Sequence, residues 1–82
     1  MRRLRAVRFL ESMHNTAIAI GRFAVTPLTR LTAAGDYIAS VSIRNGMHDR
    51  VFRFIPRFDS DASARRYAAL EGRRMVLDNQ LN

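Results

Sequence analysis

The sequence predicts an α+β fold in which a three-stranded antiparallel β-meander packs on a C-terminal helix, with a short helix before the first strand (α-β-β-β-α). Three segments have strand-like patterns separated by turn residues, and the last segment has apolar residues at helical spacing. Strands joined by short connections favour a meander that buries one face against a helix. We therefore expect one β-β-β-α domain over residues 17–82, preceded by a basic helix or tail over residues 1–16.

The charge of the chain is strongly positive and comes from arginine alone. Its 82 residues carry a formal net charge of +7, and all 14 Lys or Arg positions are arginine. An arginine side chain pairs with phosphate or carboxylate through two hydrogen bonds at once. Excess positive charge attracts nucleic acids and anionic surfaces without identifying a biological ligand. A GC-rich genome is an equally good explanation of the arginine bias.

Several classes of protein are disfavoured by what the sequence lacks. It contains no cysteine, which excludes disulfides and thiolate zinc sites and fits a reducing compartment. No apolar run approaches the roughly 20 residues of a membrane span, and no long apolar stretch or cleavage site follows the basic start, so no secretory signal is expected. These features lead us to expect a cytoplasmic bacterial protein.

Residues 2–14 have the pattern of a short basic helix. Apolar residues recur near helical spacing, and Phe9 broadens the stripe that they form: Leu4, Val7, Leu10 and Met13. Arginines in the first half of this segment oppose the helix dipole, and an isolated helix of this length is marginal in water. The segment therefore needs a surface on which to dock; without one it frays into a tail.

The first strand is expected from Ala17 to Leu28. Phe23 and Val25 share its buried face. Pro27 marks the end of this strand or an edge of the sheet, because proline cannot donate to a hydrogen-bond ladder. The following turn, residues 32–36, contains Gly35 as the expected left-handed residue.

The second and third strands are expected at Tyr37 to Arg44 and Val51 to Phe58. The former alternates apolar and polar residues with a period of two, as in a strand with one buried face. Asn45-Gly46 predicts a tight hairpin, although the following residues also allow a loop of four to six residues. Phe52 and Phe54 are expected to face the helix, and Pro56 to end regular pairing.

The C-terminal helix is expected from about Ala62 to about Asp78. Asp59 or Ser60 provides its N-cap, and Asp61 and Arg65 have the spacing of a favourable ion pair. Gly72 costs about 1 kcal/mol relative to alanine inside a helix, and allows either close packing or a bend. One face of the helix is expected to carry a set of small, aromatic and long side chains: Ala64, Tyr67, Ala68, Glu71 and Met75, with Val76 adjacent.

Catalytic and metal-binding patterns are weak in this sequence. His48-Asp49-Arg50 places a potential general base beside a carboxylate, but no nucleophile is specified, and a turn-capping role for Asp49 is the simpler interpretation. His14 and His48 lack partners at the spacing of metal ligands. The sequence has no phosphate-binding or dinucleotide-binding glycine motif. We therefore expect neither enzymatic activity, nor a cofactor, nor a metal site.

The face of the sheet away from the helix is the one candidate contact surface. Alternation places arginine and hydroxyl side chains there that can contact phosphates; its candidate nucleic-acid or partner contacts are Arg22, Arg44, Arg53, Arg57, Ser40 and Ser42, with Thr26 beside them. The simpler interpretation is the solvated side of a one-sided sheet. Ile38, Val51 and Ile55 on the same face favour a partial cover, which could be the N-terminal helix, a second copy of the chain or another protein.

Four short pieces stand out in the segment from Gly21 to Gly72: Ala39-Ser40-Val41-Ser42-Ile43-Arg44, His48-Asp49-Arg50-Val51-Phe52-Arg53-Phe54, Phe58-Asp59-Ser60 and Tyr67-Ala68. These pieces resemble a family of short uncharacterised bacterial proteins, a domain of unknown function with a β-β-β-α pattern. The family has no established activity, so the resemblance implies no site residues. The α-β-β-β-α order also resembles double-stranded-RNA-binding domains, but this chain has Asp59 and Asp61 where those domains have a basic cluster.

Two functional hypotheses follow from the sequence. The leading one is a small non-enzymatic interaction module that self-associates or binds another protein. The alternative is nucleic-acid binding through the arginine-rich open face of the sheet, although no aromatic residue is expected there for base stacking.

Overall fold

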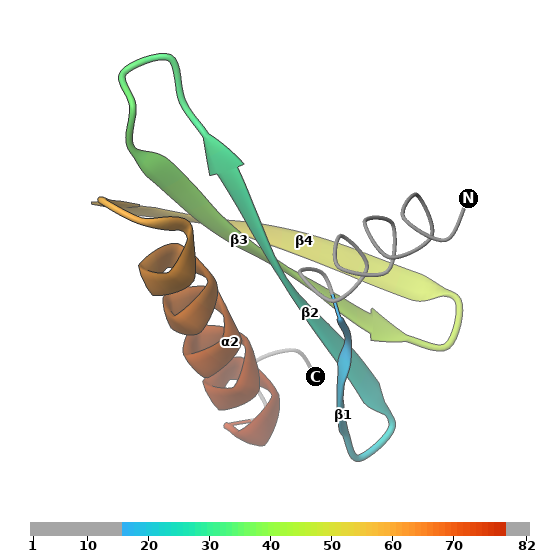
Figure 1. Ribbon diagram of the computed structural model, residues 1–82. Helices are drawn as coiled ribbons and strands as arrows, with labels where there is room; N and C mark the ends of the chain where they lie inside the picture. Colours follow the sequence, from blue (N-terminus) through green and yellow to red (C-terminus); the bar gives the residue numbers. More distant parts are fainter. Residues whose placement is uncertain (1–15, 79–82) are drawn as a thin grey trace, which may run out of the picture.

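A computed structural model of the chain describes residues 16–78, so the predicted N-terminal helix lies outside the described residues. Four strands form one antiparallel sheet in the order β1-β2-β3-β4, and the helix α2 lies across one face of it (Figure 1). The predicted α+β class and C-terminal helix are confirmed, but the prediction of three strands is wrong. The elements are β1 (Ile18–Ile20), β2 (Phe23–Leu31), β3 (Tyr37–Asn45), β4 (His48–Phe58) and α2 (Asp61–Leu77).

The additional strand arises because the segment predicted as a single first strand, Ala17 to Leu28, is a hairpin. Ile20 pairs with Phe23 across a two-residue turn, and Gly21 begins this turn with φ of 59°. Glycine adopts that left-handed conformation without steric strain, and the turns that match strand twist require it. Gly21 is therefore the residue that divides the predicted strand into two.

Pro27 limits β1 to three residues without ending β2. The residues that flank a two-residue turn exchange hydrogen bonds, and such pairs alternate along an antiparallel ladder. Ile20 with Phe23 and Ile18 with Val25 are pairs of this kind, so the next would join Thr16 to Pro27, which has no N–H. On its other side β2 stays paired with β3 as far as Leu31. Pro27 thus marks an edge, as predicted, but β2 continues past the predicted end at Leu28.

The β3–β4 hairpin is tight, as Asn45-Gly46 predicted, and its turn residues are Gly46 and Met47. Asn45 pairs with His48, and Gly46 has φ of 65°. The alternative of a loop of four to six residues is therefore wrong, and β4 begins at His48, before the predicted Val51. Gly35, in the longer connection between β2 and β3, has φ of 94°, which confirms it as the left-handed residue of that turn.

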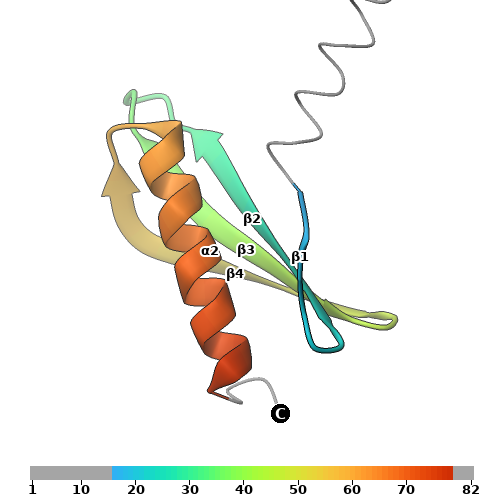
Figure 2. The same ribbon diagram turned by 60° about the horizontal axis from the view of Figure 1, so that its bottom comes forward.

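A bulge interrupts β4 around Pro56, but pairing resumes after it. Ser40 pairs with Arg53, whereas Ile38 pairs with Arg57, so β4 contains two more residues than β3 between these positions. The prediction that Pro56 ends regular pairing is therefore wrong. The extra residues bend β4, which curves toward the N-terminal end of α2 in Figure 2.

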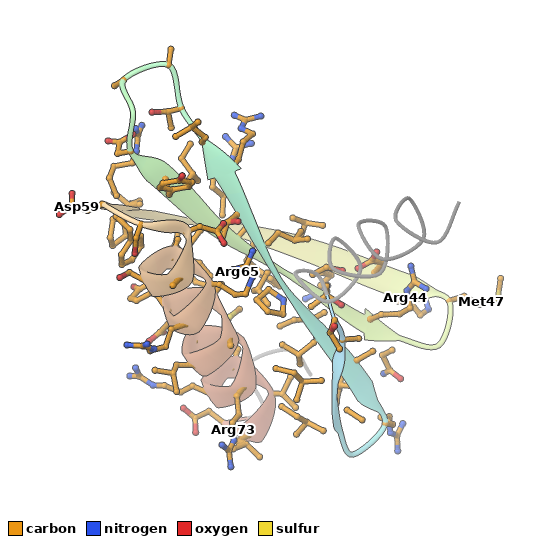
Figure 3. All side chains as sticks on the ribbon, in the orientation of Figure 1. Arg44, Met47, Asp59, Arg65 and Arg73 are labelled. Carbon is orange, nitrogen blue, oxygen red and sulfur yellow. The ribbon has the colours of Figure 1, made fainter. Side chains whose placement is uncertain are left out.

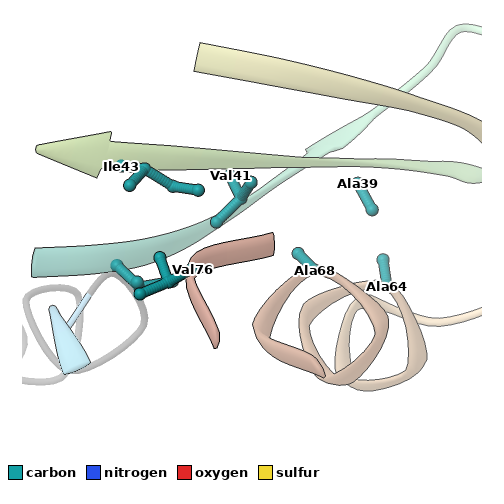
Figure 4. Packing of buried hydrophobic residues seen from close by; sticks show 7 residues of the cluster. Ala39, Val41, Ile43, Ala64, Ala68 and Val76 are labelled. Atoms are coloured by element: carbon teal, nitrogen blue, oxygen red, sulfur yellow. The ribbon is translucent and has the colours of Figure 1, made fainter. Parts of the chain in front are cut away.

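The core lies between α2 and the face of the sheet formed by β2 and β3. Small residues of α2, spaced four apart, face this sheet: Ala64, Ala68 and Gly72, followed by Val76. Figure 4 shows Ala64 and Ala68 opposite Ala39. A Cβ atom added to Gly72 would lie 2.7 Å from Cγ1 of Val25, so Gly72 permits the close approach that was one of its two predicted roles. Around this centre pack larger, partly buried side chains: Ile20, Phe23, Tyr37, Phe52, Phe54, Phe58, Tyr67 and Met75.

The start of α2 is fixed to both its own backbone and β2. Ser60 is the N-cap, and its hydroxyl accepts a hydrogen bond of 3.1 Å from the N–H of Ser63. The predicted ion pair between Asp61 and Arg65 is confirmed. The hydroxyl of Thr29 in β2 donates to Asp61, and Arg65 donates to the same hydroxyl at 3.4 Å. These contacts hold the first turn of the helix beside the last third of β2.

Candidate interaction surface: the open face of the sheet

The face of the sheet opposite α2 is uncovered within residues 16–78, and we call it the open face. Side chains alternate along each strand, so the neighbours of the buried residues of β2 and β3 point to this side. All of its members are half-buried or exposed. They are Ala24, Thr26, Leu28 and Arg30 of β2, Ile38, Ser40, Ser42 and Arg44 of β3, and Asp49, Val51, Arg53, Ile55 and Arg57 of β4.

At the hairpin end of the open face, an arginine is paired with an aspartate. Arg44 and Asp49 are cross-strand partners whose charged atoms lie 3.5 Å apart, and the Ser42 hydroxyl donates to Asp49 at 2.6 Å. Figure 3 places Arg44 near Met47 at this end of the sheet. Asp49 therefore offsets the positive charge of Arg44, and both groups are exposed enough for solvent to weaken the pair.

The opposite end of the open face has a similar arrangement. Arg57 lies 3.2 Å from a carboxylate oxygen of Asp36, in the connection between β2 and β3. The hydroxyl of Thr32 also donates to this carboxylate. The Thr32 hydrogen bond, followed by the positive charge of Arg57, holds the pKa of Asp36 below its ordinary value of 3.8. Arg57 is thus directed at an acid of its own chain.

The centre of the open face carries two arginines without an acidic partner among the described residues, Arg30 and Arg53. The register places Arg53 opposite Ser40 and Arg30 opposite Ile38, so the arginines lie on either side of β3 and two residues apart along it. Between them is a shallow hollow of about 210 Å³, lined also by Leu28, Ile38 and Ser40. This hollow combines an apolar floor with two guanidinium groups and a hydroxyl, which together can bind a carboxylate or phosphate.

Apolar side chains beside the hollow are exposed. Val51 is 63% exposed, and Ile55, in the bulge of β4, is 91% exposed. Leu28 and Ile38 are half-buried on the same face. An apolar group that is surrounded by arginines on an uncovered sheet face is typical of a surface that contacts another molecule.

The structure brings together most, but not all, of the residues predicted for this surface. Ser40, Ser42, Arg44, Arg53 and Arg57 share the open face. Arg22 does not: it lies in the β1–β2 turn, so its prediction as a member of this face is wrong.

Arg30 was missed by the sequence interpretation because the first strand was expected to end at Leu28. The alternation of Thr26, Leu28 and Arg30 continues past Pro27 and could have revealed it. The strand continues past Pro27 because a proline interrupts the hydrogen-bond ladder on only one side of a strand. The N–H that Pro27 lacks would point away from β3, so the pairing of β2 with β3 is unaffected.

His48 and Asp49 do not form a catalytic pair, because they are neighbours in β4 and successive residues of a strand point to opposite faces. Asp49 instead bonds to Ser42, so the predicted turn-capping role is also wrong. No group of three or more potential metal ligands occurs within residues 16–78. In the same part of the chain, no helix is long and apolar enough to cross a membrane.

Comparison of the chain with family models, curated proteins and solved structures found no match. The resemblance to a family of short bacterial proteins therefore stays a prediction.

Proposed function

We propose that this chain is a non-enzymatic binding module whose open face contacts a protein partner with acidic and apolar side chains. The observation that carries the proposal is the juxtaposition of the exposed Val51 and Ile55 with two arginines that have no acidic partner among the described residues, Arg30 and Arg53. An acidic side chain of the partner would enter the hollow between the arginines, and apolar side chains would cover the two aliphatic residues. Apolar and arginine side chains are common at the centre of protein interfaces.

The edges of the sheet are less suitable than its face for binding an added strand. On the β2 side, Pro27 removes a donor from the edge. On the β4 side, the bulge around Pro56 bends the strand, which also carries Arg50, Arg53 and Arg57. Proline, bulges and charged side chains are the features by which natural proteins prevent pairing between edge strands. The open face therefore offers the larger regular surface for a partner.

Charge favours a different protein over a second copy of this chain as the partner. The chain has a net charge of +7, and the aspartates nearest the open face already bind its own arginines. A symmetric dimer through this face would bring the same Arg30 and Arg53 of two chains toward one another. Like charges that are desolvated in an interface oppose association, whereas acidic groups of another protein would complement them.

Nucleic acid is the second candidate partner, supported by the net charge and by the same two central arginines. Two observations make it weaker than a protein partner. Asp36 and Asp49 occupy the ends of the open face and would repel phosphates. In addition, the open face presents no aromatic side chain among the described residues for base stacking.

Comparison of two pairs of exposed aliphatic residues tests the protein-binding proposal. Val51→Ser with Ile55→Ser removes the two most exposed aliphatic side chains of the open face, whereas Leu70→Ser with Leu77→Ser removes two from the outer side of α2, where both leucines are 58% exposed. The tagged variants are used to recover partners from nuclease-treated extracts at physiological salt, with quantification by mass spectrometry. We expect the first pair to lose specific acidic partners and the second pair to retain them; equal recovery by both would contradict the proposal.

A mobility-shift series at low and physiological salt tests the nucleic-acid alternative. Binding through phosphates weakens steeply as salt increases, and Arg53→Ala should reduce it more than Arg73→Ala, which removes the same charge from α2. Figure 3 shows Arg73 directed away from the sheet. No shift of duplex or single-stranded probes at low salt would eliminate this alternative.

A further inference from the structure

A pocket lies beside the β3–β4 hairpin, on the side of the sheet that carries α2 and opposite the open face. It has a volume of about 290 Å³ and is lined by Phe23, Ile43, Asn45, His48 and Arg50. The register explains this grouping, because Asn45 pairs with His48 and the next pair on the same face is Ile43 with Arg50. Three neighbouring strands, β2, β3 and β4, thus contribute side chains to one site.

The helix leaves the β4 part of this end of the sheet uncovered among the described residues. Along β3, α2 covers Ala39, near Ala64 and Ala68, and then Val41, which lies against Gly72. Figures 1 and 2 both show the β3–β4 hairpin extending past the helix. The two pocket residues that β4 provides are accordingly exposed, so a ligand can reach them from solvent.

The polar side chains of the pocket have no partner in the part of the chain that the structure describes. Asn45, His48 and Arg50 make neither side-chain hydrogen bonds nor ion pairs to other described residues. No acidic side chain among residues 16–78 lines the pocket. Asp49, between His48 and Arg50 in sequence, is on the open face, where it accepts from Ser42. The guanidinium group of Arg50 can therefore offer its fork of donors to an anion from outside the chain.

The floor of the pocket is apolar. Ile43 is 3% exposed, and the half-buried Phe23 packs against the same core. A ring laid on these two side chains would bury apolar surface while its charged substituent reached Arg50. An inorganic anion would leave Phe23 and Ile43 uncovered, so it would use only half of the site. The volume of about 290 Å³ is close to the lower limit of roughly 300 Å³ for small-molecule sites, so the ligand should be small.

We propose that this pocket binds a small aromatic anion, with its carboxylate or phosphate group held by Arg50 and His48 and its ring against Phe23 and Ile43. The side-chain amide of Asn45 can donate a further hydrogen bond to the anionic group. Carboxylate and phosphate share the chemistry that the guanidinium recognises, because each presents two acceptor oxygens side by side. The pocket and the open face lie on opposite sides of the sheet, so this inference does not rest on the proposed function.

NMR titration of the full-length chain with benzoate and with phenyl phosphate tests the proposal. Two isoleucines serve as reporters, because Ile43 lines the pocket and Ile38 lines the hollow of the open face. We expect saturable shifts of the Ile43 methyl and His48 ring signals with little change at Ile38, and the tighter probe identifies the favoured anionic group. Acetate and inorganic phosphate, which lack the ring, should bind more weakly. The proposal fails if neither aromatic probe saturates, if the shifts occur at Ile38 instead, or if the ions without a ring bind equally well.

Two arginines of β4 provide matched variants. Arg50→Gln removes the guanidinium group of the pocket and should weaken binding of the tighter probe about tenfold or more. Arg53→Gln removes the same charge from the open face and should leave that binding unchanged. His48→Ala should also weaken binding, whereas Met47→Ala, in the turn before it, should not. All four side chains are exposed, and the amide spectrum of β3 reports whether each variant is folded. Equal losses in Arg50→Gln and Arg53→Gln would show attraction by net charge alone and would overturn the proposal.

Discussion

Gly72 of α2 lies so close to Val41 of β3 that a Cβ atom at Gly72 would come within 2.7 Å of the Val41 Cγ2 atom. The separation between helix and sheet is therefore set at this position by the absence of a side chain. Ala64 and Ala68, earlier in the helix, have the next smallest side chains and are fully buried. The two layers can approach closely because this face of α2 is composed of small residues.

Gly72→Ala should destabilise the protein, although alanine favours a helix over glycine by about 1 kcal/mol. Overpacking a well-filled core typically costs about 1 to 3 kcal/mol; after the gain in helix propensity is subtracted, we expect a net loss of up to about 2 kcal/mol in urea unfolding. Val41→Ala should reduce the additional cost of Gly72→Ala, because it removes the Cγ2 atom that the new methyl group meets. A gain in stability from Gly72→Ala alone would show that helix propensity exceeds the steric conflict.

Phe54→Ala should destabilise the protein by about 2 to 3 kcal/mol, through the loss of a large apolar side chain and of its edge contact with a ring; the loss is smaller than the roughly 3 to 5 kcal/mol of a fully buried phenylalanine because Phe54 is half-buried. The rings of Phe54 and Tyr67 lie 5.3 Å apart at 88°. The neighbouring Ile55→Ala is the control, because Ile55 is 91% exposed and its truncation should change stability by less than about 0.5 kcal/mol. Equal effects of the two substitutions in chemical denaturation would contradict the assigned faces of β4.

Pro27→Val should lengthen the β1–β2 ladder. Valine suits a buried strand position and restores the N–H that a bond to Thr16 requires. We expect the new amide of residue 27 to exchange slowly with solvent, and light scattering to show greater self-association because the edge has lost its proline. Rapid exchange at residue 27, with unchanged scattering, would show that Pro27 does not limit the ladder.

Asp36 should contribute to stability in a pH-dependent manner. The Thr32 hydrogen bond and the charge of Arg57 lower its pKa in the folded protein below the ordinary 3.8. A carboxyl group with a lowered folded-state pKa stabilises the fold above its unfolded-state pKa, and this contribution disappears as pH falls through the folded-state value. NMR titration should therefore give a pKa below 3.8 for Asp36, and Thr32→Val should raise it. An unchanged pKa in Thr32→Val would exclude the hydrogen bond as the main cause.

Period-two alternation predicted the faces of β3 and β4 correctly. Val41 and Phe52 are cross-strand partners on the side of α2, as expected. The turn at Gly46 and the N-cap region before Asp61 were also predictable, since each depends on local residue chemistry. These features depend on interactions between residues close together in the chain.

The incorrect predictions about the strands concern one glycine, which forms a turn, and two prolines, each of which has only a local effect on pairing. Gly21 was read as part of a strand, although its left-handed conformation divides that strand into a hairpin. Pro27 was expected to mark either the end of the strand or an edge, and only the edge is observed. Pro56 was expected to end regular pairing, but pairing resumes after it. The ion pair between Arg57 and Asp36 joins separate segments, so the sequence could not show that one predicted contact arginine already has an acidic partner.

The bulge in β4 makes the effect of a deletion there depend on whether the number of deleted residues is even or odd. Because β4 contains two extra residues between Arg53 and Arg57, the alternation before and after the bulge stays in phase, and Arg57 faces solvent while Phe58 faces the helix. Loss of one residue from 54–56 would exchange these two orientations and direct a guanidinium group at the core. Loss of two residues would preserve the orientations and give the uninterrupted register that β3 itself allows. Length variation in this strand should therefore be tolerated in steps of two residues.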